Sequence, residues 1–470
     1  MRHTPFYLLL LLLFSRSVSA QTTQTEKQTD SITRLMIRYL NESKPDSAYA
    51  YWGEAARKQF TPESWRNVYK GNLSPFLPFS DITYTGSHDG MNIYMMKGVM
   101  PLNLYAKLDV SGKLETFFFQ PVKVNLPQKT TTALSDNPLK SHLDSIVESA
   151  VRPYINLAGN VGLSAGVRYN GQDYFYNYGT VRLNTDTLPD NHTIYETGSI
   201  TKTFTGTLLA LAVIQKKVTL DQPITKFLPD SVAKNPALKG ITLKQLANHT
   251  AGFPSLPSNL STSRAEQPYE NYDQAHLFSY LKSAAPENPP GKVHSYSNFG
   301  FGLLGVILER IYGMNYAALL SKYITGPQGL KHTGISVYGK IAQGYDGGLS
   351  PVAMWDLNAM KSAGAIKSDA ADLLKYASLQ LQQGKDPLQQ ACALAHQATY
   401  DDGATKIGLA WVRFQHQDDY LFHNGATGGY RSFLLADTLN NTAVVILVNS
   451  VNGVEAVGAQ IVQNLKNKKK

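Results

Sequence analysis

The pattern of apolar and polar positions predicts a small leading domain in which helices precede strands. Five apolar residues between Ile32 and Leu40 recur at helical spacing, so one face of a first helix is apolar. A second helical stretch covers 46–60, and Thr61-Pro62 then supplies a capping residue and a proline at the start of a third helix. Strand-like runs follow over 82–84, 91–100, 102–110 and 114–119. This order predicts an α+β domain with a meander sheet.

The remaining residues predict a second, larger domain with strands at both ends and helices between them. A helix near 143–154 precedes strands over 163–169 and 174–178, which are joined by Asn170-Gly171, a strong hairpin signal. The chain then ends with strands near 409–414, 432–436 and 443–448 and a helix over 454–465. We therefore expect a mixed α/β fold, in which one antiparallel sheet is closed by its own termini, flanked by helices and joined to an all-helical lobe.

The first 20 residues have the pattern of a signal peptide. Arg2 and His3 precede an apolar run over 7–14, and Val18-Ser19-Ala20 offers small residues for cleavage before Gln21. The apolar run is about half of the roughly 20 residues that a membrane span needs. We therefore expect a secreted or periplasmic protein with no integral membrane span after cleavage.

These patterns predict five segments along the chain. They are a signal peptide over 1–20, a small α+β domain over 21–121, a linker over 122–137, the larger domain over 138–466 and a basic tail over 467–470.

Composition narrows the chemistry. The single cysteine, Cys392, cannot form an intramolecular disulfide. The histidines are scattered without a metal-binding spacing, and the glycine-rich stretches lack the strand-to-helix setting of phosphate sites. The formal net charge is +9, but the only dense basic cluster is the terminal run of lysines. We therefore expect no metal, no cofactor and no nucleic-acid partner.

Ser199 and Lys202 form a Ser-x-x-Lys pattern, whose spacing places both side chains on one face of a helix. A lysine with a depressed pKa could then take the proton of the serine. The pattern recurs at Ser231 and Ser279, but Ser231 lies between prolines, which favours a loop, and Ser279 falls within a predicted helix. Ser199 instead follows Gly198 and precedes a long apolar helical run, so we favour Ser199 as the nucleophile.

A rival nucleophile is Ser164, because Gly162-Leu163-Ser164-Ala165-Gly166 fits the Gly-x-Ser-x-Gly elbow. That motif requires a strand, a sharp turn and then a helix. Ser164 instead opens a predicted strand that runs into a hairpin, so the required context is missing.

Two further motifs offer groups that could assist Ser199. Tyr296, if it lies near a lysine ammonium, could be held as a phenolate and serve as a general base and later as an acid. Asn298 would orient the lysine and a substrate amide. His423-Asn424-Gly425 and Ala426 precede a predicted strand, where glycine permits close approach of a substrate and backbone amides could complete an oxyanion hole. A core tyrosine and a tight glycine turn with a surface histidine are the alternatives.

In the order Ser-x-x-Lys, Tyr-x-Asn and His-x-Gly, these motifs resemble those of the family of class C β-lactamases, D-alanyl-D-alanine carboxypeptidases and related esterases. The sequence around and between these motifs is also similar to that family, for example at Thr197-Gly198, from Leu246 to His249 and at Gly408-Leu409-Ala410-Trp411. The resemblance covers residues 138–466. The leading domain looks like a small module of unknown function that is sometimes found ahead of such hydrolases.

The resemblance implies a role for each matched residue. Ser199 would attack the substrate, while Lys202 and Tyr296 would move its proton. Asn298 would position a side chain or the substrate. His423 would take the place of the basic residue of the third motif.

The third motif departs from the β-lactamase pattern. Histidine stands at 423 in place of lysine, and Asn424 occupies the position of a hydroxyl residue. Because those groups would bind the carboxylate of the drug, the resemblance does not imply efficient β-lactam hydrolysis. The amides of Ser199 and Ala426 would form the oxyanion hole.

The sequence thus predicts an exported serine hydrolase that acts through a Ser199 acyl-enzyme on a small ester, amide or D-amino-acid peptide. One alternative is a D-alanyl-D-alanine carboxypeptidase or penicillin-binding protein that acts on cell-wall peptide. The other is a binding protein of the cell envelope that kept the fold without turnover.

Overall fold

The structure is a computed structural model of the whole chain. It describes residues 22–59, 61–69, 73, 77–97, 102–121, 128–261, 264, 266–403, 405–414 and 417–466. The chain forms two compact units, Met1–Asn125 and Leu126–Lys470. The predicted signal peptide, the predicted tail and residues 122–127 of the predicted linker lie outside the described residues.

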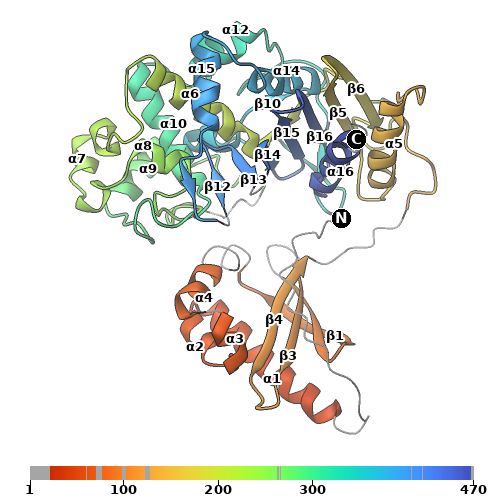
Figure 1. Cartoon of the computed structure of the whole chain (residues 1–470), viewed down its shortest axis with the longest axis vertical. Helices are drawn as coiled ribbons and strands as arrows, with labels where there is room; N and C mark the ends of the chain where they lie inside the picture. The colour runs from red at the N-terminus through yellow and green to blue at the C-terminus, as the bar shows by residue number, and fades with distance from the viewer. Residues whose placement is uncertain are drawn as a thin grey trace. The chain divides into compact units, whose positions relative to one another are not determined.

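The first unit packs short helices against an antiparallel sheet whose strands are hydrogen-bonded in chain order, which confirms the predicted meander. Asp89 and Gly90 make its first turn, with left-handed φ angles of 52° and 74° that suit a two-residue hairpin. The predicted helix over 46–60 is instead two short helices, because Trp52 between them bridges to the sheet. The elements are α1 (Thr22–Asn41), α2 (Pro45–Tyr49), α3 (Glu54–Gln59), α4 (Pro62–Val68), β1 (Ser80–His88), β2 (Met91–Lys97), β3 (Leu102–Leu108) and β4 (Leu114–Pro121) (Figure 1).

The second unit is built on an antiparallel sheet of eight strands, in which the first two strands of the unit join the last. The strands are β5 (Gly162–Tyr169), β6 (Gln172–Gly179), β11 (Tyr400–Asp401), β12 (Lys406–Ile407), β13 (Val412–Phe414), β14 (Gln417–Ala426), β15 (Arg431–Asp437) and β16 (Thr442–Val448). Their order is β11-β12-β13-β14-β15-β16-β5-β6. This confirms the predicted sheet closed by strands from both ends of the domain.

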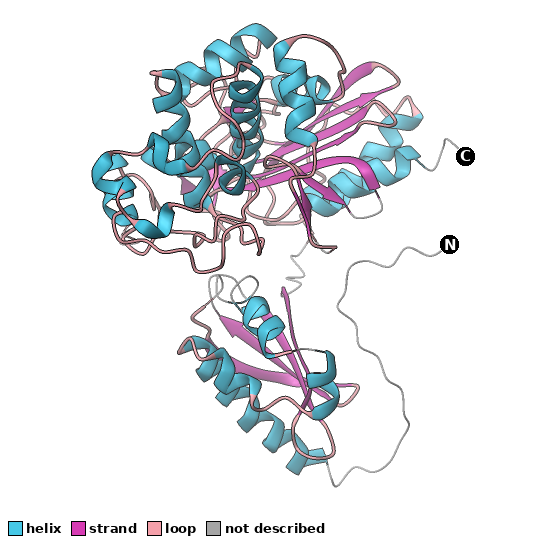
Figure 2. Cartoon of the chain, turned by 60° about the vertical axis from the view of Figure 1, so that its left-hand side comes forward, coloured by secondary structure: helices cyan, strands magenta, loops and turns pink. Residues whose placement is uncertain are grey.

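Helices cover both faces of this sheet (Figures 1 and 2). Alternate residues of β16 divide between the two cores: Val444, Ile446 and Val448 face two terminal helices, whereas Val445 and Leu447 face the helical lobe. The helices are α5 (His142–Ile155), α6 (Thr201–Ile214), α7 (Asp230–Ala233), α8 (Leu243–Ala247), α9 (Gln274–Leu281), α10 (Asn298–Tyr312), α11 (Tyr316–Leu320), α12 (Gly326–Gln328), α13 (Lys361–Gly364), α14 (Ala370–Gln380), α15 (Pro387–His396) and α16 (Glu455–Lys466).

Two pairs of short strands form separate two-stranded sheets. β7 (Tyr195–Glu196) pairs with β10 (Lys367–Ser368), and β8 (Gly344–Tyr345) pairs with β9 (Pro351–Val352). Helix α6 is buried on nearly all sides, because its apolar residues extend around the whole helix rather than along one stripe. Within the described residues no single helix is long and apolar enough to cross a membrane, and α10 with the helical stretch after it reaches that length only across a 75° bend.

The longest strand of the sheet, β14, was missed by the sequence analysis, which placed the segment around His423 just before a strand. Polar residues at its start and Asn424-Gly425 near its end conceal the alternation that marks a strand. The correction matters, because a residue in a strand points to one face or the other of the sheet.

Replacing Gly206 tests the packing of α6. A Cβ atom at Gly206 would collide with the carbonyl oxygen of Leu409, so α6 would have to move away from it. We expect Gly206→Ala to lower the unfolding temperature, although alanine favours helices. The free energy of unfolding should fall by the roughly 1–3 kcal/mol typical of overpacking. Gly240→Ala is the matched control, since no atom lies within 4 Å of its added Cβ. Equal melting curves for the two variants would contradict this packing.

Candidate active site

Ser199 lies where β7 turns sharply into a helix. Gly198 has a left-handed φ of 50°, and the 3₁₀ turn Gly198–Ile200 continues directly into α6. Thr197 holds this turn in place, because its backbone N–H and its hydroxyl both donate to the carbonyl oxygen of Ile366, at 3.0 Å and 2.8 Å. These two hydrogen bonds tie the residue after β7 to the residue before β10, and so they fix the start of α6.

Lys202 is fully buried one turn after Ser199. Its Nζ atom lies 2.9 Å from Ser199 Oγ, 2.8 Å from Asn298 Oδ1 and 2.7 Å from the carbonyl oxygen of Ala363. Burial holds the pKa of Lys202 well below its usual value. An uncharged amine has two N–H donors and one lone pair. The two carbonyl oxygens accept both donors, so the lone pair is left to face the hydroxyl of Ser199.

Tyr296 contacts Ser199 from the lobe. Its hydroxyl donates a hydrogen bond of 2.7 Å to Ser199 Oγ. Although 40 % of the side chain is exposed, the surrounding protein partly dehydrates the hydroxyl group and raises the pKa of Tyr296. The amine of Lys202 lies over the ring, 4.8 Å from its centre.

The expectation of a phenolate stabilised by a lysine ammonium is not supported by these pKa directions and stays a prediction. It required a charged Lys202, whereas burial favours the neutral forms of both groups. In this arrangement Tyr296 is a hydrogen-bond donor to Ser199, and Lys202 is the group able to accept the proton of the serine.

His249 is a supporting residue that the sequence analysis did not single out. Its Nδ1 atom accepts a 3.0 Å hydrogen bond from the backbone of Ser297, and its ring lies 4.4 Å from the ring of Tyr296 between centres. Burial lowers the pKa of His249 well below its usual value, so the ring is neutral. A single histidine in a loop carries no pattern, and only the fold brings it beside the tyrosine.

The end of β14 packs tightly against the turn that carries Ser199. A Cβ atom at Gly425 would lie 2.9 Å from the amide nitrogen of Ser199, and one at Gly198 would lie 2.6 Å from the amide nitrogen of Ala426. Glycine is therefore needed at both positions. The amide of Thr427 donates to Tyr430 across the hairpin, so by strand alternation the Ala426 amide points away from β15.

His423 and Asn424 point to opposite faces of the sheet. His423 is 3 % exposed, and burial, with a smaller contribution from Lys202, lowers its pKa to about 4. Its Nδ1 atom lies 2.7 Å from the carbonyl oxygen of Asn424, so the neutral ring donates there and leaves Nε2 as an acceptor. His423 is thus uncharged, so it does not supply the positive charge that the basic residue of the third motif would carry.

Asn424 requires a correction as a substrate-binding residue. Its side-chain nitrogen donates to Glu455 Oε1 of α16 at 2.7 Å, on the face of the sheet opposite to the lobe. Its side chain is therefore directed away from Ser199 and joins β14 to α16.

A small pocket of about 50 Å³ opens at Ser199. Its walls are mainly aromatic and aliphatic, and none of its lining residues is charged. Trp355 is held at the rim because its backbone amide donates to the buried carboxyl of Glu196 at 2.7 Å. The lining residues are Ser199, Tyr269, Asn298, Trp355, Leu357, Met360, Ala363, Gly364, Ala426 and Thr427. Sequence patterns did not reveal the walls, which come from segments distant from one another in the chain.

The competing serines lie in other settings. Ser164 is fully buried within β5, with its Oγ 3.1 Å from the hydroxyl of Tyr195 and no sharp turn beside it. Ser279 lies within α9, as predicted. Ser231 lies in the one-turn helix α7 rather than in a loop, because that turn follows Pro229 and ends before the next proline.

The second unit matches known proteins. A family model described as Beta-lactamase matches residues 147–466. A β-lactamase of Pseudomonas fluorescens is 32 % identical over 278 residues, which are 58 % of this chain and 74 % of that protein. A β-lactamase of Providencia stuartii is 32 % identical over 276 residues, which are 57 % of this chain and 68 % of that protein.

Solved structures agree with these matches. A β-lactamase/D-alanine carboxypeptidase of Pseudomonas syringae superposes with a TM-score of 0.62 at 25 % identity, covering 69 % of this chain and 99 % of that chain. A class C β-lactamase superposes with a TM-score of 0.63 at 22 % identity, covering 69 % of this chain and 96 % of the other. At that identity the second likeness concerns the fold alone.

The protonation state of Lys202 can be tested through stability. Its folded pKa is depressed, so from neutral to mildly alkaline pH the unfolded chain binds a proton there that the folded chain does not. Stability should therefore rise with pH relative to Lys202→Met, by up to about 1.4 kcal/mol per pH unit. Denaturant unfolding of both proteins between about pH 7 and pH 9 measures this difference.

Lys239→Met is the matched control, since Lys239 is exposed. Its unfolding free energy should run parallel to that of the unsubstituted protein over the same pH range. If the free energy of unfolding of Lys202→Met also changes with pH in parallel with that of the unsubstituted protein, the buried amine is not neutral.

Proposed function

Because the chain belongs to the β-lactamase family of serine hydrolases, we propose that Ser199 forms an acyl-enzyme and that Lys202 activates it. One observation carries this proposal. Ser199 Oγ lies within hydrogen-bond distance of both Lys202 Nζ and Tyr296 Oη, and the lysine is fully buried. This geometry supplies a nucleophile, an uncharged base and a proton donor at one point.

Acylation would proceed as follows. As Ser199 Oγ forms a bond to the carbonyl carbon of the substrate, its proton passes to the lone pair of Lys202 Nζ. Asn298 and the carbonyl of Ala363 keep the lysine in position by accepting its two N–H bonds. The hydroxyl of Tyr296 donates to the leaving group as the bond to it breaks, and the proton held by Lys202 restores the tyrosine.

The amides of Ser199 and Ala426 support the tetrahedral intermediate. Both residues line the pocket, and the glycines at 198 and 425 let their backbones approach closely. Each such donor contributes roughly 3 kcal/mol to the transition state. Water then replaces the leaving group and releases the acid by the same proton path in reverse.

We propose a small, uncharged acyl ester or amide as the substrate class. The pocket is lined by uncharged side chains, and the neutral His423 offers an acceptor rather than a positive charge. A substrate carboxylate would lose its hydration without gaining an ion pair, which is costly. Penicillins and D-alanyl-D-alanine peptides, which carry that carboxylate, should therefore react less well than a neutral ester.

We also propose that the protein acts outside the cytoplasm. The support is the pattern of the first 20 residues, with its apolar run and small residues before Gln21.

Intact-protein mass spectrometry tests the acyl-enzyme. The whole chain is expressed with its native leader and exposed to a short neutral acyl ester, a D-alanyl-D-alanine peptide and a penicillin. We expect an ester adduct on Ser199 and at least about 10³-fold slower ester turnover in Ser199→Ala. Ser231→Ala is the matched control, because Ser231 begins another Ser-x-x-Lys and should react normally. The intact mass of the exported protein should equal that of a chain that begins at Gln21.

Each outcome bears on a separate part of the proposal. An adduct that persists in Ser199→Ala, or a folded protein that reacts with none of the three compounds, would overturn the acyl-enzyme. Faster turnover of the penicillin or the peptide than of the ester would keep Ser199 and refute the neutral substrate class. A mass that retains the leader would refute cleavage before Gln21.

A further inference from the structure

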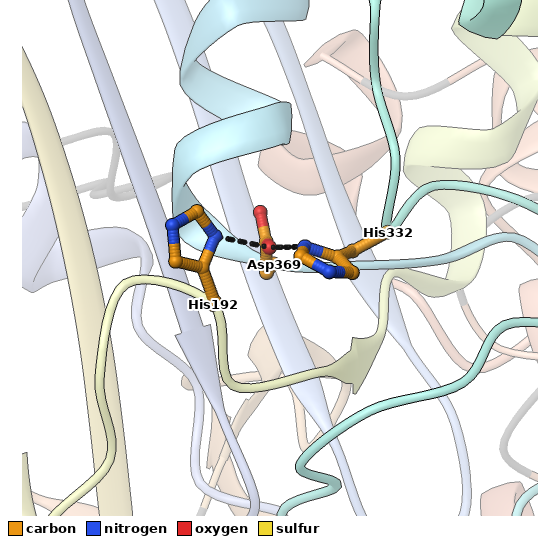
Figure 3. A group of neighbouring side chains, drawn as sticks. All are labelled: His192, His332 and Asp369. Atoms are coloured by element: carbon orange, nitrogen blue, oxygen red, sulfur yellow. Dashed lines mark hydrogen bonds and ion pairs between the residues drawn. The ribbon is translucent and has the colours of Figure 1, made fainter.

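Two histidines that are far apart in the sequence converge on one buried carboxylate. His192 precedes β7, and His332 follows α12. Their Nδ1 atoms lie 3.0 Å and 2.6 Å from the same oxygen, Oδ2 of Asp369 (Figure 3). Figure 3 shows the two imidazoles on either side of Asp369, which stands at the start of the α14 helix. The sequence analysis saw only scattered histidines and expected no metal.

Within the part of the chain that the structure describes, no lysine or arginine forms an ion pair with Asp369. The Asp369 side chain is 0 % exposed, and its other oxygen, Oδ1, caps α14 by accepting from the amide of Asp372 at 2.7 Å. Among the described residues, its ion-pair partners are His192 and His332 alone. A nearby positive charge stabilises a buried carboxylate.

The positions of the three atoms suit a metal ion. Nδ1 of each histidine and Oδ2 of Asp369 all lie within 4.8 Å of one another. Zinc binds imidazole nitrogen and carboxylate oxygen at about 2.0–2.2 Å, which separates tetrahedral ligands by roughly 3.3 Å. The nitrogen–oxygen distances of 2.6 Å and 3.0 Å are therefore shorter than this ligand separation by about 0.7 Å and 0.3 Å. A small rotation of the side chains would admit the ion.

We propose that His192, His332 and Asp369 bind a divalent zinc-type cation, with water as the fourth ligand. The side chains of His192 and His332 are 58 % and 31 % exposed, which leaves a path for the ion and room for the water. The ion would place a positive charge beside the buried carboxylate. Soft sulfur ligands are absent from this set, and the mixed nitrogen and oxygen donors suit zinc, nickel or cobalt rather than calcium.

The site would stabilise the framework that carries Ser199. Asp369 follows β10 directly, and β10 pairs with β7, which leads through Thr197 to the nucleophile. The loop of His192 is also tied to α14, because the amide of Ala371 donates to the carbonyl of Asn191 at 3.0 Å. A bound ion would join three separate segments at this point, so its effect is on stability and not on a chemical step.

Metal titration of the whole chain, prepared without a histidine tag, tests the site. After chelation and dialysis, Zn²⁺ and Co²⁺ are added while the unfolding temperature and the visible absorption of cobalt are recorded. We expect about one cobalt ion per chain with the absorption of a four-coordinate site, and a higher unfolding temperature with either ion. The variants are His192→Asn and His332→Asn, because the amide nitrogen of asparagine keeps a hydrogen-bond donor near Asp369 but does not ligate.

Each variant should lose at least about 10-fold in metal affinity and most of the thermal shift. His276→Asn is the matched control, since His276 pairs with a single exposed carboxylate, Asp273, at 2.7 Å. It should bind metal like the unsubstituted protein. The metal site would be refuted if the unsubstituted protein bound no metal, or if both His192→Asn and His332→Asn bound it undiminished. The three residues would then form only a hydrogen-bonded cluster. Ester turnover by Ser199 does not enter this test, so the two proposals fail independently.

Discussion

The structure of the site depends on one interaction: the uncharged amine of Lys202 held in the interior by two carbonyl oxygens. Burying a lysine is costly, and the cost is smallest when the amine is neutral and its two N–H bonds are accepted. Asn298 of α10 and Ala363 of α13 supply those acceptors. Three helices must therefore meet at Lys202, and their meeting fixes the direction of the remaining lone pair toward Ser199.

Close backbone packing completes this arrangement from the sheet side. Gly425 of β14 touches the turn around Gly198, and no larger residue fits at either position. The same contact brings the amides of Ser199 and Ala426 to one pocket. Yet the third motif brings no charge, because His423 is buried beside the lysine and stays neutral.

Local patterns predicted the parts that local physics determines. The helical spacing of Ser199 and Lys202 and the Asn170-Gly171 hairpin follow from neighbours in the sequence. The direction of a side chain in β14 and the protonation of Tyr296 depend instead on which elements pack around them. The side chain of Asn424 was therefore placed wrongly, the protonation of Tyr296 stays a prediction, and the convergence of histidines on Asp369 was not visible at all.

The account rests on Lys202, and not Tyr296, as the acceptor of the serine proton. The most direct test is the single-turnover rate of Ser199 acylation by a neutral ester, measured from about pH 5 to pH 10 for the unsubstituted protein and Tyr296→Phe. The account predicts that the rate levels off by neutral pH in both proteins, with a uniformly lower plateau in the variant. A rate that keeps rising into the alkaline range, and loses that rise in Tyr296→Phe, would identify a phenolate base and contradict it.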